Sequence, residues 1–243
     1  MIKKSVRKIF NYFGYDLIRK KGMPEVVYTL DNKFNALYDL AQRKCQMVNT
    51  DNTYRRQRHY TLNHLLWNFK PNKGDVCELG CWRGLSAYQI ATHIKSLNEN
   101  IDLHIFDSFQ GLSEYDDIDI VPEIEQDFNQ RREQFACGED IVRSNLSEFD
   151  FIHYYKGWIP TRFDEVKYHQ FSFVHIDVDL YQPIYDAFEF FYPRLVKGGI
   201  MVFDDYGSTM FPGAKKAVDE YLKKINFPFF LPLPSGQAFL LKP

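Results

Sequence analysis

Short apolar runs alternate with stretches of helical periodicity along most of this chain. Seven runs are predicted to be strands, at residues 75–79, 101–106, 151–155, 171–176, 200–203, 227–231 and 238–241. Apolar residues at helical spacing predict helices over residues 85–97, 187–196 and 213–225, the second of them closed by Lys197-Gly198-Gly199. Strands and helices that alternate at this spacing are typical of an α/β fold, with a mostly parallel sheet covered by helices on both faces.

The last two predicted strands are an exception to the parallel arrangement. Only residues 232–236 separate them, which leaves no room for the crossover helix that a parallel pair requires. We therefore expect a seven-stranded sheet whose last strand is antiparallel.

The N-terminal part of the chain has a different pattern. Within residues 1–22, apolar positions recur at helical spacing and lysines and arginines occupy much of the opposite face, which predicts an amphipathic basic helix. Residues 24–60 are predicted to form further helices. We thus divide the chain into a helical extension, 1–60, and an α/β domain, 61–243. Two interpretations of the first helix stay open: it packs on this domain or on a second copy in a homo-oligomer, or it lies on an anionic membrane surface.

Composition narrows the class of protein. The 243 residues carry a formal net charge of −2, so the basic character of a nucleic-acid-binding protein is missing. No run approaches the ~20 apolar residues of a membrane span, and no secretory leader is recognisable. The four cysteines form no C-x-x-C pair, which favours reduced thiols in a cytoplasmic protein.

A glycine-containing turn follows the first predicted strand and opens the next helix. The sequence there is E-x-G-x-x-x-G, with Glu78, Gly80 and Gly84. A dinucleotide-binding turn requires another glycine between Gly80 and Gly84 so that the backbone can approach a pyrophosphate, and this glycine is missing. Asp107 ends the second strand, where an acid can accept hydrogen bonds from ribose hydroxyls. Together these features favour a nucleoside cofactor without a pyrophosphate.

Acidic residues also follow the fourth and fifth predicted strands. Asp177 and Asp179 follow the fourth, and Asp204 and Asp205 follow the fifth. If these strands are neighbours, Asp177, Asp204 and Asp205 converge, and carboxylates at such close range need a cation between them unless they are protonated or paired. Oxygen ligands favour Mg²⁺ or a similar ion, which would lower the pKa of a bound hydroxyl and so activate it. Asp177 is the first candidate for ligand and general base, with Asp179 and His175 in reserve.

Several sequence blocks, in the same order along the chain, closely resemble the macrocin O-methyltransferase (TylF/MycF-like) family. They are Glu78-Leu79-Gly80-Cys81-Trp82-Arg83-Gly84 with Ser86, Phe106-Asp107-Ser108-Phe109-Gln110-Gly111-Leu112, Lys156-Gly157-Trp158, 173–183, 191–195 with Gly198-Gly199, 204–207 and 212–215. The resemblance implies a Rossmann-like class I methyltransferase fold, S-adenosylmethionine as methyl donor, magnesium, and a sugar hydroxyl as acceptor. By position, Asp177, Asp204 and Asp205 correspond to the metal ligands, and Glu78, Gly80, Ser86, Asp107 and Ser108 to the cofactor-binding residues.

The acceptor is less defined by the sequence than the cofactor. Residues 180–183 differ from the corresponding segment of macrolide-modifying members and the C-terminus is short, so the resemblance favours a sugar of a surface glycan over an antibiotic. We expect the acceptor pocket to be built from residues 114–138 and the N-terminal region. Two alternatives remain: Asp177-Val178-Asp179 resembles the D-x-D metal motif of nucleotide-sugar glycosyltransferases, and the same fold can serve a binding protein without turnover.

Overall fold

The computed structural model describes residues 27–47, 51–68, 74–121, 128–225 and 229–243. The predicted amphipathic helix at residues 1–22 lies outside the described residues. Among the described residues, no helix is both long enough and apolar enough to cross a bilayer.

Seven strands of the described chain form one sheet. In chain order they are β1 (Asp75–Leu79), β2 (Leu103–Asp107), β3 (Ile152–Lys156), β4 (Phe171–Ile176), β5 (Leu195–Phe203), β6 (Phe229–Pro232) and β7 (Ala238–Leu241). Their order across the sheet is β3-β2-β1-β4-β5-β7-β6. The first five are parallel, and β7 runs antiparallel to both β5 and β6. The predicted mixed sheet is confirmed.

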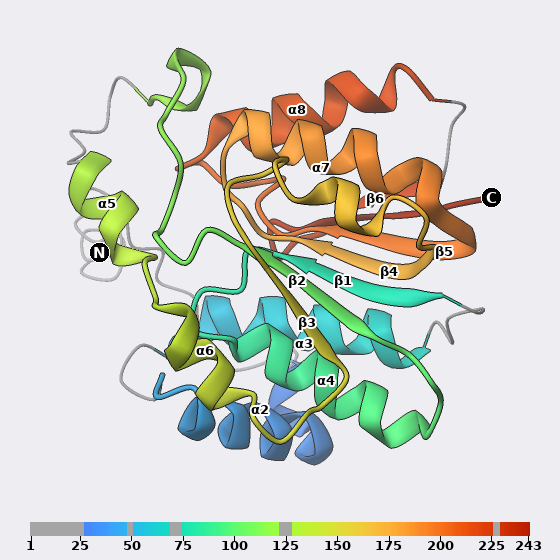
Figure 1. The fold of residues 1–243 in the computed structure, drawn as a ribbon. Coiled ribbons are helices and arrows are strands. Elements are labelled where there is room, and N and C mark those ends of the chain that lie inside the picture. The colour runs from blue at the N-terminus through green and yellow to red at the C-terminus, as the bar shows by residue number, and fades with distance from the viewer. Residues whose placement is uncertain (1–26, 48–50, 69–73, 122–127, 226–228) are drawn as a thin grey trace, which may run out of the picture.

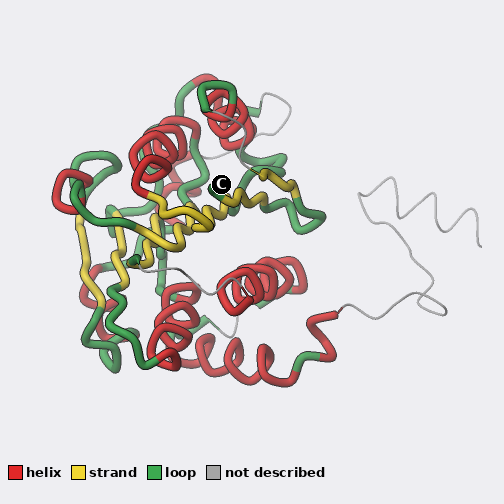
Figure 2. The backbone as a smooth tube through the Cα atoms, turned by 90° about the vertical axis from the view of Figure 1, so that its right-hand side faces the viewer, coloured by secondary structure: helices red, strands yellow, loops and turns green. Residues whose placement is uncertain are grey.

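Helices cover both faces of this sheet, which gives three layers (Figures 1 and 2). The helices are α2 (Asn32–Lys44), α3 (Thr53–Asn68), α4 (Leu85–Leu97), α5 (Phe128–Gln134), α6 (Glu139–Asn145), α7 (Tyr181–Arg194) and α8 (Pro212–Leu222). Short 3₁₀ turns occur at η1 (Val27–Leu30), η3 (Asp117–Asp119) and η4 (Phe163–Val166). Helices α7 and α8 lie over one face, and α2, α3 and α4 lie over the other.

The two helix layers enclose two apolar cores. Phe34 and Tyr38 of α2 and Leu66 of α3 pack with side chains of the sheet such as Ile105. Phe188 of α7 belongs to the core on the opposite face. Removal of large apolar side chains from water is the main source of stability in such layers. Residues N-terminal to the sheet therefore help to form the core that supports it.

Two details differ from the sequence-based prediction. Helix α7 begins at Tyr181 rather than at residue 187, because the carboxylate of Asp119 accepts the Tyr181 backbone N–H at 2.9 Å. It ends at Arg194, and the glycines expected to close it lie inside β5, where Gly198 donates to the Lys242 carbonyl at 2.8 Å. The predicted boundary between the helical extension and the α/β domain, at residue 60, lies inside helix α3. The division into these two parts stays a prediction.

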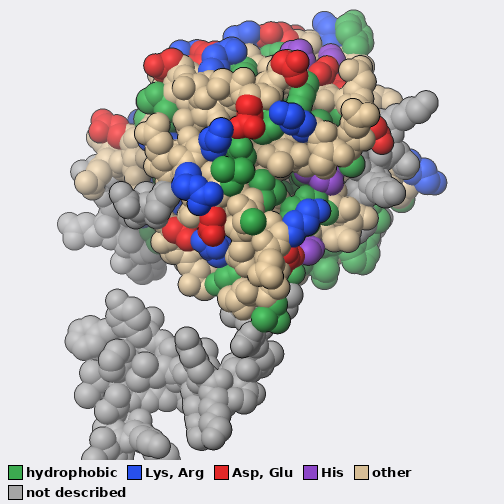
Figure 3. Space-filling model, turned by 90° about the horizontal axis from the view of Figure 1, so that it is seen from below, with side chains coloured by type: hydrophobic (Ala, Val, Ile, Leu, Met, Phe, Trp, Pro, Cys, Tyr) green, Lys and Arg blue, Asp and Glu red, His purple; other side chains and the backbone are tan. Residues whose placement is uncertain are grey.

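Neither the charged side chains on one face nor the cysteines indicate a functional site among the described residues. On the face seen from below in Figure 1, basic and acidic side chains are interspersed (Figure 3). All four cysteines are buried and free of disulfides, and burial raises the pKa of the Cys77 and Cys81 thiols well above the ordinary value. These thiols are therefore protonated and serve as small apolar groups.

Candidate functional site

A cavity lies where the strand order reverses, between β1 and β4. It has a volume of about 360 Å³ and is bordered by the carboxyl ends of all five parallel strands. These ends contribute Gly80 after β1, Asp107 of β2, Gly157 after β3, Asp177 after β4 and Asp204 after β5. Ligands of open parallel sheets bind at this position, because the loops that follow neighbouring strands diverge there.

The absence of a side chain matters at both Gly80 and Gly84, but for different physical reasons. Gly80 has a φ of +80°, and a Cβ atom there would lie 1.9 Å from the carbonyl oxygen of Asp177. The ends of β1 and β4 can therefore meet only if residue 80 has no side chain. Gly84 has a φ of +88° and precedes α4, but a Cβ atom would contact only the side chain of Leu146, at 3.4 Å. Its role is in the backbone turn, and it is not among the described residues that line the cavity.

Asp107 holds this turn in place. One carboxylate oxygen accepts the backbone N–H groups of Cys81 at 2.7 Å and Trp82 at 3.2 Å. The other oxygen accepts the N–H of Phe109 at 2.7 Å. A carboxylate has about four acceptor positions, so roughly one stays available for a ligand. Asp107 and the neighbouring Ser108 both line the cavity.

Three carboxylates from two adjacent strands meet around the guanidinium of Arg58, which reaches them from α3. The pairing of β4 with β5 aligns Ile176 with Phe203, so the acids that follow the two strands are neighbours. Arg58 Nη2 lies 3.0 Å from Asp205 Oδ1 and 3.8 Å from Asp177 Oδ1, and it forms an ion pair with Asp204. The predicted convergence of Asp177, Asp204 and Asp205 is therefore present in the structure, with an arginine at its centre.

The pKa values of Asp177 and Asp179 are both raised in this cluster. Burial and the negative charge of Asp205 raise the pKa of Asp177 to about 7, although Arg58 partly opposes the shift. The pKa of Asp179 is raised well above its ordinary value, again by burial and by Asp205 and Asp177. Burial disfavours the charge on Arg58, but the neighbouring carboxylates outweigh it and raise its pKa. The single positive charge of Arg58 thus balances only part of the negative charge of the neighbouring carboxylates.

The donor set fits a divalent cation. All the carboxylate atoms are hard oxygen ligands, and Asp205 Oδ2 is buried without a hydrogen-bond partner among the described residues. Donor atoms of His175, Asp177 and Asp204 also lie within 4.8 Å of one another. An orphaned carboxylate oxygen is costly unless a cation satisfies it. Arg58 Nη2, however, contacts other oxygens of the same three carboxylates: Asp177 Oδ1, Asp204 Oδ2 and Asp205 Oδ1.

His175 connects this acidic cluster to Glu78 beneath it. Its Nδ1 lies 3.0 Å from Glu78 Oε1, and its Nε2 lies 3.4 Å from Asp204 Oδ1. Asp204 Oδ1 also accepts a hydrogen bond from Gln237. Glu78 is completely buried and is not among the described residues that line the cavity. It therefore supports the cluster through His175 and has no direct access to the cavity.

Apolar side chains form much of the remaining wall. The cavity is lined by Trp82, Phe135, Trp158, Ile159 and Phe211, together with Tyr54 and other residues of the N-terminal segment. Ser86, from the first turn of α4, is also part of the lining. A mostly apolar cavity with a few convergent polar groups is characteristic of a small-molecule site.

The sequence interpretation missed Arg58. Three arginines lie within four residues, at positions 55, 56 and 58, and nothing in the local pattern distinguishes them. Arg56 pairs with Asp39 and Asp51, away from the cavity, whereas Arg58 points into the acidic cluster. The two arginines have different partners because of the position of α3 over the sheet, which directs Arg58 and not Arg56 into the acidic cluster.

Known proteins resemble this chain in sequence over much of its length. The family model described as macrocin-O-methyltransferase (TylF) matches residues 56–230. The demethyldecarbamoylnovobiocin O-methyltransferase of Streptomyces niveus is 27% identical over 158 residues, which are 63% of this chain and 60% of the relative. The mycinamicin III 3''-O-methyltransferase of Micromonospora griseorubida is 28% identical over 155 residues, 61% of this chain and 60% of the relative. The matches thus span about three fifths of these curated relatives.

Solved structures show the same fold. The structure of the O-methyltransferase NovP superposes with a TM-score of 0.67 at 20% identity, and the match covers 86% of this chain and 99% of that one. CalS11, a calicheamicin methyltransferase, has a TM-score of 0.63 at 17% identity, with 92% and 99% covered. The predicted Rossmann-like class I methyltransferase fold is confirmed.

Proposed function

The chain belongs to the macrocin-O-methyltransferase (TylF) family, and we propose that it is an S-adenosylmethionine-dependent O-methyltransferase that acts on a sugar hydroxyl with a divalent metal ion. The observation that carries the proposal is the meeting of Asp177, Asp204 and Asp205 beside the Gly80 turn, in a single cavity. The turn supplies a nucleoside site and the acids supply a place to activate a hydroxyl.

The cofactor would bind between the Gly80 turn and Asp107. Asp107 already accepts three backbone N–H groups, so its remaining acceptor position would accept a hydrogen bond from one ribose hydroxyl. This modifies the sequence-based expectation that Asp107 binds both hydroxyls. Ser86 and Ser108 provide further polar groups in the lining, and the buried charge of Glu78 complements the sulfonium and ammonium groups at longer range.

The chemistry would take place at the acidic cluster. When bound, S-adenosylmethionine would supply an electrophilic methyl group for the acceptor oxygen, and a nearby carboxylate would take the hydroxyl proton. Asp204 and Asp205 would hold the cation, with Asp177 completing the set. When bound, such an ion lowers the pKa of the acceptor hydroxyl and orients it.

Among the candidate bases, Asp177 has the best geometry. Its side chain is 34% exposed, whereas those of Asp204 and Asp205 are 8% and 4% exposed. This exposure would let Asp177 reach an acceptor hydroxyl in the cavity and take up its proton. Both ring nitrogens of His175 already face acids, so His175 would orient Asp204 instead of receiving the proton.

The acceptor would occupy the part of the cavity near Tyr54, Phe135 and Trp158. Aromatic faces and serine hydroxyls suit the alternating apolar and polar faces of a sugar ring. The name of one curated relative, from Streptomyces olivaceus, describes 4'-O-methylation of a rhamnosyl derivative of tetracenomycin C. Together with the departures noted at residues 180–183, this supports a sugar acceptor, and we propose a glycan. Membrane contact and homo-oligomerisation, predicted from residues 1–22, stay predictions.

Turnover tests the proposal directly. The full-length protein would be incubated with S-adenosylmethionine, Mg²⁺ and either nucleotide sugars or glycans extracted from the host, and S-adenosylhomocysteine would be measured. We expect acceptor-dependent product that is lost when a chelator is added. Turnover that continues at the full rate in chelator would refute the metal requirement. A protein that binds S-adenosylmethionine but methylates none of these acceptors would favour the non-catalytic alternative.

A further inference from the structure

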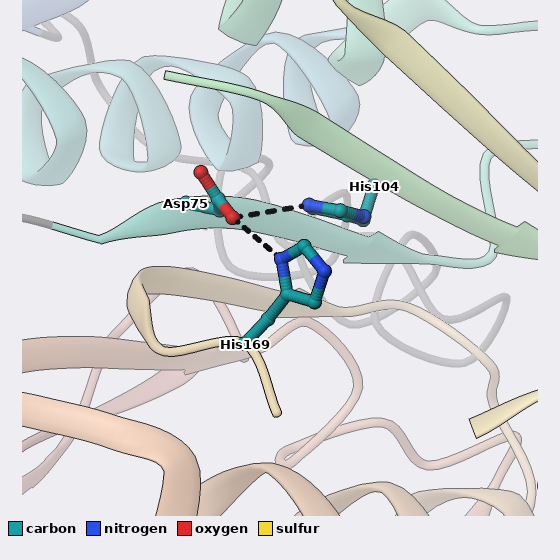
Figure 4. A group of neighbouring side chains, drawn as sticks. All are labelled: Asp75, His104 and His169. Atoms are coloured by element: carbon teal, nitrogen blue, oxygen red, sulfur yellow. Dashed lines mark hydrogen bonds and ion pairs between the residues drawn. The ribbon is translucent and has the colours of Figure 1, made fainter. Parts of the chain in front are cut away.

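Three ionisable side chains converge at the edge of the sheet opposite the cavity. Asp75 is the first residue of β1, His104 is the second residue of β2, and His169 lies in the loop that leads into β4 (Figure 4). Parallel strands place their first residues at the same edge, so these side chains are separated from the acidic cluster by the length of the sheet. They contribute nothing to the reaction proposed above.

Both imidazoles point a ring nitrogen at the same carboxylate oxygen. His169 Nδ1 lies 2.9 Å from Asp75 Oδ2, and His104 Nε2 lies 3.3 Å from it. The three donor atoms all lie within 4.8 Å of one another. Ligands around a tetrahedral zinc ion, each about 2.0–2.2 Å from the metal, are separated by similar distances. Small rotations of the side chains would therefore be sufficient to bring all three onto one ion.

Each buried ligand also has an outer partner. His104 Nδ1 lies 2.9 Å from the hydroxyl of Tyr155, and Asp75 Oδ1 accepts the backbone N–H of Asp102 at 3.3 Å. The His104 ring is almost completely buried and packs edge-on against the His169 ring. A metal-binding histidine usually has its second nitrogen oriented by such a hydrogen bond. Tyr155 can serve His104 in this way, because its hydroxyl can donate or accept.

We infer that Asp75, His104 and His169 form a second, structural metal site that binds a zinc ion. Two imidazole nitrogens and one carboxylate favour a borderline metal such as zinc over magnesium. The side chain of His169 is 40% exposed, which leaves an open direction for a water molecule as fourth ligand. The ion would fasten the loop before β4 to the first residues of β1 and β2.

Proton positions distinguish this site from a simple hydrogen-bonded cluster. In a cluster without metal, the ring nitrogens that face Asp75 would donate hydrogen bonds to its carboxylate, and the Tyr155 hydroxyl would donate to His104 Nδ1. With zinc bound, those nitrogens would present lone pairs to the ion, and His104 Nδ1–H would donate a hydrogen bond to the Tyr155 hydroxyl.

Cobalt absorption tests the inference with a signal that comes from the metal itself. The metal-depleted full-length protein would be titrated with Co²⁺ in excess Mg²⁺, which occupies the acidic cluster, and the d–d bands of a low-coordinate cobalt site would be followed. We expect one equivalent of Co²⁺ to produce the bands and Zn²⁺ to abolish them. The double variant Asp204→Asn/Asp205→Asn, if it folds, should give the same titration, which separates this site from the one near Arg58.

Two histidine variants provide the matched comparison. His169→Ala removes a proposed ligand at the surface and should weaken binding by more than about tenfold. His153 is an exposed histidine whose ring stacks on His104, but its Nε2 lies 3.3 Å from Asp102 Oδ2 and does not face Asp75. His153→Ala should therefore leave metal binding unchanged. Zinc should also raise the melting temperature of the wild type and not of His169→Ala. Absence of the bands, or equal binding by wild type and His169→Ala, would overturn the inference.

Discussion

Arg58 Nη2 lies 3.0 Å from Asp205 Oδ1, and the same nitrogen contacts Asp204 and approaches Asp177. A helix N-terminal to the sheet thus supplies a cation to acids at the ends of β4 and β5. If a metal ion binds these acids, the guanidinium must move. Helix α3 and the metal are therefore coupled through one set of carboxylates.

Replacement of Arg58 by glutamine should strengthen metal binding. Removal of the competing guanidinium should raise the affinity for Mn²⁺ by about tenfold or more, measured by the loss of its free-ion electron paramagnetic resonance signal. In chelator, the variant should lose about 2–4 kcal/mol of unfolding free energy, because three crowded carboxylates lose their cation, and Mg²⁺ should restore part of it. Arg56→Gln, which breaks pairs with Asp39 and Asp51, should leave metal affinity unchanged. Weaker metal binding by Arg58→Gln would contradict the competition.

Asp204→Asn should separate turnover from cofactor binding. The change removes a charge from the cluster but leaves the Gly80 turn intact, so kcat should fall by about a hundredfold or more while the Kd for S-adenosylmethionine changes by less than about threefold. Initial rates and titration calorimetry measure the two quantities. The control is Asp186→Asn, because Asp186 accepts a hydrogen bond from Gln182 on the exposed side of α7. An Asp204→Asn enzyme of wild-type kcat would remove the acidic cluster from the mechanism.

Asp107→Ala should act first on binding. Loss of its carboxylate releases the N–H groups of Cys81, Trp82 and Phe109 and removes the proposed ribose acceptor. The Kd for S-adenosylmethionine should rise by about 10–100-fold, equivalent to roughly 1.4–2.7 kcal/mol. Asp150→Ala, at an exposed loop position, should leave the Kd unchanged. Unaltered affinity in Asp107→Ala would show that the ribose binds elsewhere.

Gly80→Ala and Gly84→Ala should differ sharply in stability. Both residues have a positive φ, but the added methyl group at residue 80 would lie 1.9 Å from the Asp177 carbonyl, against 3.4 Å from a flexible leucine at residue 84. We expect a loss of about 1 kcal/mol for Gly84→Ala and at least about 3 kcal/mol for Gly80→Ala, measured by urea denaturation. Equal losses would mean that the ends of β1 and β4 are not in close contact.

The stability contributed by Asp75 should depend on pH in a defined direction. Hydrogen bonds from His104 and His169 outweigh burial and lower the pKa of Asp75 to about 2. A lowered carboxyl pKa stabilises the fold above the unfolded value of 3.8, and the contribution is lost as the pH falls towards 2. In chelator, Asp75→Asn should therefore cost about 1–2 kcal/mol at pH 7 and about half as much at pH 3. A loss of unfolding free energy in Asp75→Asn that is larger at pH 3 than at pH 7 would contradict the lowered pKa of Asp75.

Local pattern was sufficient to predict much of the fold. The bounds of β1, β4, β7 and α4 agree with the prediction, because each is an uninterrupted apolar or periodic stretch. The start of α7 was missed because its cap, Asp119, lies 62 residues away in the chain. The start of β5 was missed because Gly198 and Gly199 are paired with Lys242 near the C-terminus.

The candidate site was predicted unevenly for the same reason. Acids at the ends of adjacent strands converge by topology, so the meeting of Asp177, Asp204 and Asp205 followed from the strand assignment. Arg58 comes from a separate helix, and only tertiary packing brings it to them. Glu78 was expected in the cofactor shell, but its position in β1 aligns it with His175, so its side chain lies under the cavity.

The central claim is that this cavity binds S-adenosylmethionine beside a cation site. Titration calorimetry of the metal-depleted full-length protein with S-adenosylmethionine and with a UDP-sugar, each with and without Mg²⁺, tests it most directly. We predict one S-adenosylmethionine per chain whether or not Mg²⁺ is present, and no heat from the UDP-sugar in the absence of cofactor. Mg²⁺-dependent binding of the UDP-sugar, with none of S-adenosylmethionine, would contradict the account and support a glycosyltransferase.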